Sequence, residues 1–92
     1  MRAIERTTRF KKDFKREVQG KHRDVLQDIF IQVVTKLASD ERLDEKYFDH
    51  ALSNNWKDCR DCHLKPDLVL IYRKIEHTLQ LIRLGSHSKL GL

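Results

Sequence analysis

The chain has 92 residues, of which 39% are hydrophobic and 36% charged, and its formal net charge at pH 7 is +5. This length predicts a single domain over residues 1–92, with too much apolar content for a disordered chain. No window approaches the roughly 18 apolar residues of a membrane span. The N-terminus also lacks the apolar core of a signal peptide, so we expect a cytoplasmic protein and no membrane partner.

The charge is distributed unevenly. Residues 1–23 carry nine basic and three acidic side chains, residues 24–51 three and seven, and residues 52–92 seven and four. A basic first segment is typical of proteins that bind a polyanion or an acidic protein. A solvated helix face has the same composition, so charge alone does not decide between these readings.

In the first half of the chain, apolar residues recur with the period of an amphipathic helix. A short edge strand is predicted at residues 3–7, and Thr7 or Thr8 is placed to cap the helix that follows. Gly20 ends this helix, and a second helix with a broad apolar face is predicted over residues 23–38. Residues 44–55 are predicted to form a loop.

The second half has the pattern of strands. Strands are predicted at 56–64, 68–72 and 78–84, separated by turns at 65–67 and 73–77. The order β-α-α-β-β-β predicts an α+β fold, with a helical hairpin packed on one side of a small, mostly antiparallel sheet. The predicted core contains Phe10, Phe14, Val25, Ile29, Val33, Leu70 and Tyr72.

Three of the five histidines, together with two aspartates, lie near the ends of predicted strands, where side chains distant in sequence converge on one edge of a sheet. They are His50, Asp61, His63, Asp67 and His87. The other two histidines, His22 and His77, lie in predicted turns and are expected to be exposed.

A cluster of imidazoles suits acid–base chemistry, because one ring accepts a proton while another delivers one near neutral pH. RNA supplies its own nucleophile, the 2′-hydroxyl. Its cleavage needs a base, an acid and cations for the phosphorane charge, and His with Lys and Arg provides all three. A small basic domain with such a cluster therefore suits a metal-independent endoribonuclease without a cofactor.

Two other kinds of site are disfavoured by the sequence. Cys59 and Cys62 form a C-x-x-C motif, but no second well-spaced ligand pair accompanies it, and in a strand the two thiols point to opposite faces. We therefore expect reduced structural thiols and no metal. The helical hairpin at 8–38 is a poor helix-turn-helix, because its second helix is apolar enough to pack on the sheet.

Four segments carry a resemblance to a known family: D-H-A-L at 49–52, W-K-D-C-R-D-C-H-L-K-P-D at 56–67, L-I-Y at 70–72 and R-L-G-S-H at 83–87. Together they resemble the YafQ toxins of the RelE/ParE superfamily over essentially the whole chain. The resemblance implies a RelE-like fold and the toxin of a type II toxin–antitoxin system. It also implies ribosome-dependent cleavage of translated mRNA, and hence inhibition of translation.

The resemblance extends to partners and to site residues. It implies an acidic cognate antitoxin, the ribosome and mRNA as partners, with operator DNA contacted mainly through the antitoxin. Four positions match the family's catalytic residues: His50, His63, Asp67 and His87. Three further residues are assigned supporting or phosphate-binding roles: Asp61, Lys65 and Arg83. In this assignment His50 or His63 is the general base, His87 is the general acid, and Asp67 orients an imidazole.

One position departs from the family pattern. Gly91 stands where the family usually has an aromatic side chain that stacks on a base. Two alternative functions stay open at this point. One is a ParE-like toxin that poisons gyrase, although such members lack the His/Asp cluster. The other is a non-catalytic module that binds RNA or an acidic protein.

Overall fold

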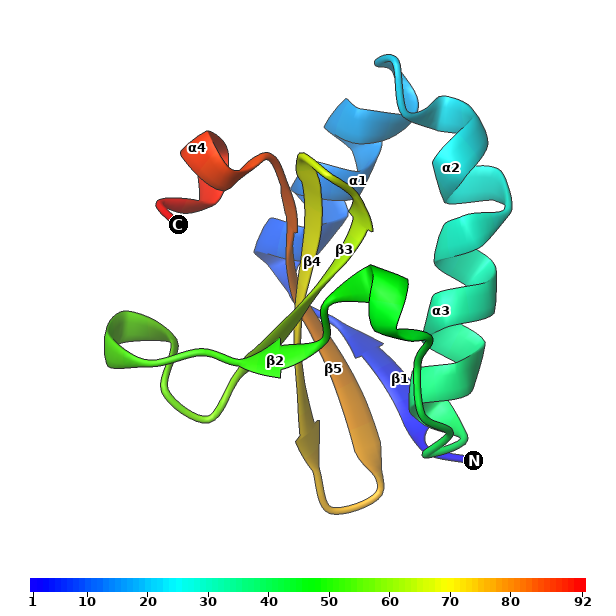
Figure 1. Cartoon of the computed structure of the whole chain (residues 1–92), viewed down its shortest axis with the longest axis vertical. Helices are drawn as coiled ribbons and strands as arrows, with labels where there is room; N and C mark the ends of the chain where they lie inside the picture. The colour runs from blue at the N-terminus through cyan, green and yellow to red at the C-terminus, as the bar shows by residue number, and fades with distance from the viewer.

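The two hydrophobic periods of the sequence become two layers, a group of helices and a five-stranded sheet (Figure 1). The computed structural model describes all 92 residues. Its elements are β1 (Ala3–Arg6), α1 (Thr8–Val18), α2 (Arg23–Gln27), α3 (Ile29–Ala38), β2 (His50–Ala51), β3 (Arg60–Lys65), β4 (Leu68–Ile75), β5 (Thr78–Gly85) and α4 (His87–Leu90), with 3-10 turns η1 (Glu45–Tyr47) and η2 (Asn54–Trp56). None of the helices is long and apolar enough to span a membrane.

The strands lie in the order β1-β5-β4-β3-β2, and only β1 pairs in parallel, with β5. The predicted α+β architecture is therefore confirmed, with β2 and α4 as small additions that the sequence did not indicate. The predicted turn at 73–77 was too long, because β4 continues to Ile75 and the chain reverses at Glu76 and His77. The polar residue Arg73 belongs to the strand, since its guanidinium is bonded to Gln80 on β5.

Thr7 is the N-cap of α1. Thr7 Oγ1 accepts a hydrogen bond from the Phe10 N–H at 3.0 Å and donates one to the Ile82 carbonyl at 2.8 Å, so the predicted cap also ties the helix to β5. The single helix predicted over 23–38 is divided into α2 and α3. Asp28 separates them with a non-helical backbone (φ −131°, ψ −76°). Asp has a low helix propensity, because its side chain can hydrogen-bond to nearby backbone groups in non-helical conformations.

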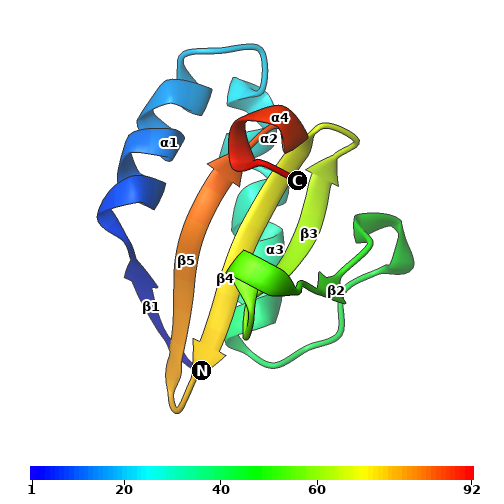
Figure 2. The same cartoon turned by 90° about the vertical axis from the view of Figure 1, so that its left-hand side faces the viewer.

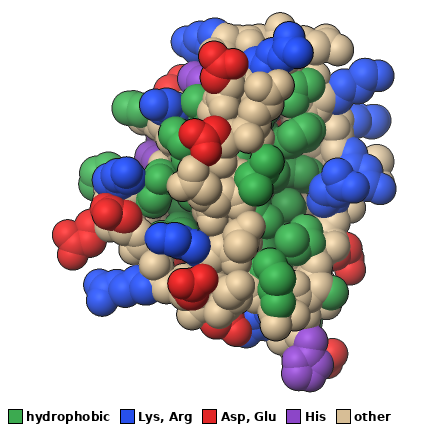
Figure 3. Space-filling view, turned by 90° about the vertical axis from the view of Figure 1, so that its right-hand side faces the viewer, with side chains coloured by type: hydrophobic (Ala, Val, Ile, Leu, Met, Phe, Trp, Pro, Cys, Tyr) green, Lys and Arg blue, Asp and Glu red, His purple; other side chains and the backbone are tan.

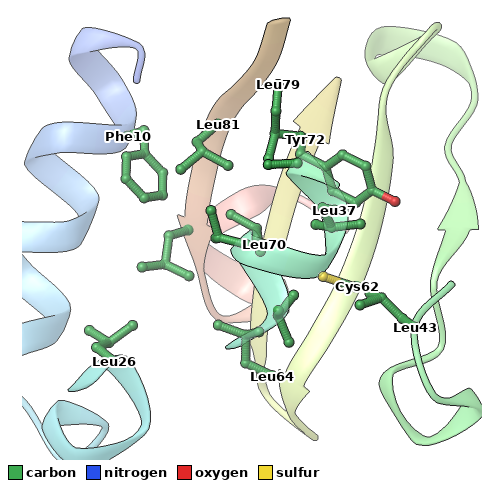
Figure 4. Packing of buried hydrophobic residues seen from close by; sticks show 14 of the residues in the cluster. Phe10, Leu26, Leu37, Leu43, Cys62, Leu64, Leu70, Tyr72, Leu79 and Leu81 are labelled. Atoms are coloured by element: carbon green, nitrogen blue, oxygen red, sulfur yellow. The ribbon is translucent and has the colours of Figure 1, made fainter. Parts of the chain in front are cut away.

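The main core fills the space between the helices and the sheet (Figure 4). The predicted core residues lie in it or against it: Phe10, Val33, Leu70 and Tyr72 are buried, and Phe14, Val25 and Ile29 pack on its rim. A smaller cluster of Cys59, Val69, Ile71 and Leu90 forms a second apolar contact. Figure 2 shows α4 on the side of the sheet away from α3, and β2 at the edge of the sheet next to β3.

One buried ion pair joins the helical layer to the end of β5. The Asp13 carboxylate accepts hydrogen bonds from Arg83 Nε at 2.7 Å, from the Leu84 N–H at 3.0 Å and from Arg16 Nη1 at 2.9 Å. Burial alone would raise the pKa of Asp13, but the bonds from Arg83, Leu84 and Arg16 outweigh it and hold that pKa below its usual value. Arg16 completes the link by donating to the Leu84 carbonyl at 2.9 Å.

Replacing Asp13 by Ala should destabilise the fold by about 3–5 kcal/mol, because it leaves the buried Arg83 guanidinium without its partner. Urea unfolding at neutral pH measures the change. Since the pKa of Asp13 is lower in the folded state, its contribution is complete above about pH 3.9 and is lost as the pH falls further. Lys12→Ala is the matched control: Lys12 is exposed on the same helix, with no ion pair. A loss for Asp13→Ala no larger than that of the control would contradict the prediction.

Candidate active site

The structure brings the five predicted acid–base residues together from three parts of the chain. His50 lies on β2, Asp61 and His63 lie on β3, Asp67 lies in the turn between β3 and β4, and His87 begins α4. The ring of His63 is central: its centroid is 6.1 Å from that of His50 and 5.1 Å from that of His87. Convergence at strand ends, expected from the sequence, is therefore observed.

Asp67 holds His87 from two directions. Asp67 Oδ1 lies 2.8 Å from His87 Nδ1 and accepts the His87 backbone N–H at 3.0 Å. Hydrogen bonds from the side chain and backbone of His87 lower the pKa of Asp67, so this carboxylate is ionised near neutral pH. An ionised carboxylate only accepts, which puts a proton on His87 Nδ1 and leaves Nε2 as the atom able to exchange protons.

His50 is held by an equally definite contact. Its Nδ1 lies 2.7 Å from the Phe48 carbonyl oxygen and 3.0 Å from Asp61 Oδ1. A carbonyl oxygen only accepts hydrogen bonds, so Nδ1 carries the proton, and Nε2 of the neutral ring has a free lone pair. The side chain is 54% exposed, so this lone pair is open to a ligand.

Asp61 lies beneath His50 and His63 and is nearly inaccessible to solvent. Its exposure is 2%, and its Oδ2 is 3.9 Å from His63 Nε2. Its Oδ1 accepts no hydrogen bond, because His50 Nδ1, although only 3.0 Å away, is bonded to the Phe48 carbonyl. Burial raises the pKa of Asp61, and the charges of His50, His63 and His87 only partly oppose this effect. The sequence predicted a supporting acid here, and the structure adds that its charge is poorly solvated.

The two basic residues assigned to phosphate lie in different environments. Lys65 is exposed at the end of β3 and makes no ion pair. Arg83 is 9% exposed and bonded through Nε and Nη2 to Asp13, so most of its guanidinium is already engaged. Two lysines that the sequence did not single out, Lys21 and Lys89, line a cavity with Asp67. No local motif marked them, because only folding brings 21 and 89 together.

The remaining two histidines, His22 and His77, lie in different environments. His77 is exposed in the β4–β5 turn, as predicted, and lies outside the cluster. His22 is half-buried instead of exposed, because it ends up at the start of α2, in the cavity lined by Asp67 and Lys89. His77 is therefore the cleaner control for the histidine cluster.

The cysteines do not form a ligand pair. Cys62 is fully buried in the main core and Cys59 belongs to the smaller cluster, so the two thiols lie apart as predicted. The predicted strand over 56–64 was too long at its start, however, because β3 begins at Arg60 and Cys59 lies in the loop before it. A different trio has ligand atoms within 4.8 Å of one another: His50, Asp61 and His63. Imidazole nitrogens and a carboxylate oxygen are a donor set that suits zinc or copper. A bound ion would occupy the same lone pairs that proton transfer requires.

Comparison with known proteins gives concordant matches. The family described as "Bacterial toxin of type II toxin-antitoxin system, YafQ" matches residues 2–91. The "mRNA interferase toxin YafQ" of Escherichia coli strain B / BL21-DE3 is 34% identical over 89 residues, covering 97% of this chain and 95% of the relative.

Solved structures agree with this match. A metal-bound toxin from Helicobacter pylori is 46% identical with a TM-score of 0.85, covering 98% of this chain and 99% of that one. The toxin of an E. coli DinJ–YafQ toxin–antitoxin complex is 34% identical with a TM-score of 0.78, covering 97% of this chain and 96% of that one.

Replacing Asp61 by Asn should stabilise the fold at neutral pH by about 1 kcal/mol, because it removes a poorly solvated buried charge. The pKa of Asp61 is higher in the folded than in the unfolded state, so the native protein loses stability as the pH rises through that interval. The advantage of the variant should therefore be full at pH 7 and vanish below about pH 3.9. Urea unfolding at pH 7 and pH 3.5 measures both.

Asp49→Asn is the control for that measurement. The Asp49 carboxylate is satisfied by Tyr72 Oη at 2.6 Å and Arg60 Nε at 3.1 Å, so its neutralisation should lower stability at pH 7. A loss of stability at pH 7 in both variants would contradict the conclusion that the buried charge of Asp61 lowers the stability of the folded state.

Proposed function

The chain belongs to the YafQ family of bacterial toxins of type II toxin–antitoxin systems, and we propose that it is an mRNA interferase that cleaves translated mRNA on the ribosome. The E. coli relatives bear the name mRNA interferase toxin. The observation that carries the proposal is the row of three imidazoles, His50, His63 and His87, with a carboxylate beside each end of the row.

In the proposed reaction His50 is the general base. Its Nε2 takes the proton of a ribose 2′-hydroxyl, and the 2′-oxygen forms a bond to the adjacent phosphorus. Because Nδ1 is fixed by the Phe48 carbonyl, the proton-accepting lone pair has a defined direction. The sequence left His50 and His63 as alternatives, and this contact favours His50.

His87 is the proposed general acid. Its Nε2 delivers a proton to the 5′-oxygen as the bond from phosphorus to that oxygen breaks, which leaves a 2′,3′-cyclic phosphate on one product and a 5′-hydroxyl on the other. Asp67, ionised and 2.8 Å from Nδ1, balances the positive ring before transfer. Opposite proton transfers by two imidazoles need no metal, so we propose a metal-independent reaction.

Charge that develops on the phosphate needs cations nearby. His63 lies between the proposed base and acid, and Lys65 is exposed at the end of its strand without an ion pair. Both are proposed to face the phosphate. Arg83 is proposed to act indirectly, through its bond to Asp13 at the strand end that leads to His87.

The ribosome is proposed to position the message. A basic domain of this size has few groups with which to grip and unstack free RNA, and positioning is a large part of catalysis. We therefore propose that the substrate is mRNA bound in the decoding site of the ribosome, and that free RNA is cut poorly.

The proposed partner is an acidic cognate antitoxin that binds the helical side of the molecule. The E. coli relative was solved as a complex of DinJ with YafQ. Figure 3 shows hydrophobic side chains on the helical side of this chain, with Lys and Arg groups and several acidic groups around them. Three lysines on α1 are exposed and make no ion pair: Lys11, Lys12 and Lys15. Their positive charges are therefore available to an acidic segment of the antitoxin.

Single His→Ala variants at 50 and 87 should lower cleavage of ribosome-bound mRNA by about 10²–10⁴-fold, the usual contribution of an acid or base. His63→Ala should lower it by about 10²–10³-fold, the usual effect of removing a group that stabilises charge in the transition state. Cleavage is measured on a translated message with purified ribosomes, and the ends of the products are identified chemically. A 2′,3′-cyclic phosphate and undiminished activity in EDTA are expected. His77→Ala is the control and should retain wild-type activity.

Several outcomes of that experiment would contradict the mechanism. They are products with a 5′-phosphate and a plain 3′-hydroxyl, activity lost in EDTA and restored by zinc, and equal cutting of naked RNA. Gyrase inhibition without RNA cleavage would replace the proposed activity altogether.

Reversing the charge at Lys11, Lys12 and Lys15 to Glu should slow association with the antitoxin at least about tenfold at low salt, with a smaller effect at high salt. The antitoxin is obtained by co-expression from the native operon, and association rates are measured at two salt concentrations. Lys57→Glu, in the loop before β3, is the control. An unchanged association rate, or recovery of the wild-type chain alone as an active but harmless protein, would contradict an acidic partner at α1.

A further inference from the structure

We propose that a groove beside the histidine cluster is a nucleobase subsite, in which the ring of Phe48 stacks on a base close to the cleaved bond. The inference rests on the proposed RNA cleavage. The groove has a volume of about 480 Å³ and is lined by Ile29, Lys46, Tyr47, Phe48, His63 and Lys65. Since His63 belongs both to this groove and to the cluster, a nucleotide in the groove is next to the proposed reacting phosphate.

Phe48 is placed as a stacking surface. Its exposure is 66%, whereas every other aromatic residue of the chain is buried or half-buried. Its ring centroid is 5.8 Å from that of His63, with the planes inclined by 58°. The ring therefore borders the site with most of its surface open to solvent, where every base can use it because every base has a π-face.

The backbone of Phe48 has an unusual conformation for a bulky residue. Its dihedral angles, φ 49° and ψ 43°, lie in the left-handed region, where Gly or Asn is ordinarily favoured. In this conformation its N–H closes η1 on the Glu45 carbonyl, and its own carbonyl accepts from His50 Nδ1. One residue thus fixes the proposed base through its backbone and presents an aromatic ring through its side chain.

The charges of the groove fit a nucleotide better than an apolar ligand. Lys46 and Lys65 lie in the lining, and neither makes an ion pair, so both are free to meet phosphates on either side of a bound base. Lys46 Nζ is 5.2 Å from the centroid of the Tyr47 ring, a cation–π contact that keeps it beside the groove. An apolar floor with a cationic rim is the arrangement that single-stranded RNA requires.

The test measures cleavage of ribosome-bound mRNA by variants at position 48. Phe48→Ala and Phe48→Leu should lower kcat/KM by about 5- to 150-fold, the range of one base–aromatic stack. Phe48→Trp should lose much less activity than Phe48→Ala, because it keeps an aromatic face. Ile31→Ala is the matched control, since Ile31 is 56% exposed on α3 and should not affect cleavage.

Phe48→Gly separates stacking from folding. Glycine adopts positive φ without strain, so this variant should unfold at a higher urea concentration than Phe48→Ala, yet should lose as much activity. Activity within twofold of wild type for Phe48→Leu or Phe48→Gly would overturn the subsite. A loss in Phe48→Trp equal to that in Phe48→Ala would also overturn it, in favour of a contact with ribosomal protein.

The proposed function is tested separately in the same assay. A wild-type chain that cleaves and a His87→Ala variant that does not would support RNA cleavage whatever the Phe48 variants do. A wild-type chain that fails to cleave translated mRNA would remove both the function and the subsite that depends on it.

Discussion

The buried carboxylate of Asp13 is the contact through which the helical layer fixes the strand end that leads into the site. It binds Arg83 and the Leu84 N–H, two residues before Ser86, whose side chain caps α4 and so places His87. A Cβ on Gly85 would stand 2.9 Å from Arg16 Nη2, so glycine gives the guanidinium room to reach the Leu84 carbonyl. Removing either partner of a buried ion pair leaves an uncompensated charge, so the position of α1 and the end of β5 are mutually dependent.

Asp61 is the opposite case, a buried carboxylate that the fold does not satisfy. Asp13 has a lowered pKa because several donors surround it, whereas the pKa of Asp61 is raised because burial is opposed only by imidazoles. An unsatisfied buried oxygen is uncommon in proteins and calls for an explanation. The explanation we favour is that its charge serves the histidines, so stability is lost where the proposed chemistry takes place.

Much of the fold followed from the sequence because its hydrophobic periods were unambiguous. The 3.6 period through Phe10 and Phe14 and the apolar run at 68–72 fixed the two layers. The break at Asp28 and the length of β4 escaped prediction, since both are set by tertiary contacts. In the site, the histidines were located by family resemblance and by their place at strand ends. Phe48 and Asp13 were not, because exposure, a positive φ and a partner 70 residues away are properties of the folded chain alone.

The pairing register of β2 to β5 brings the side chains of the candidate active site together. His50 pairs directly with Asp61, and His63 pairs with Val69, which in turn faces Gly85 across β4 and β5. Side chains alternate between the faces of a sheet, so a slip of one residue in β3 would put Asp61 and His63 among the core leucines and bring Cys62 to their face. The register shift between His63 and Lys65 then ends β3 with a tight turn that carries Asp67 to His87. The geometry of the site is therefore a consequence of strand pairing, and apolar residues of the core hold that pairing in place.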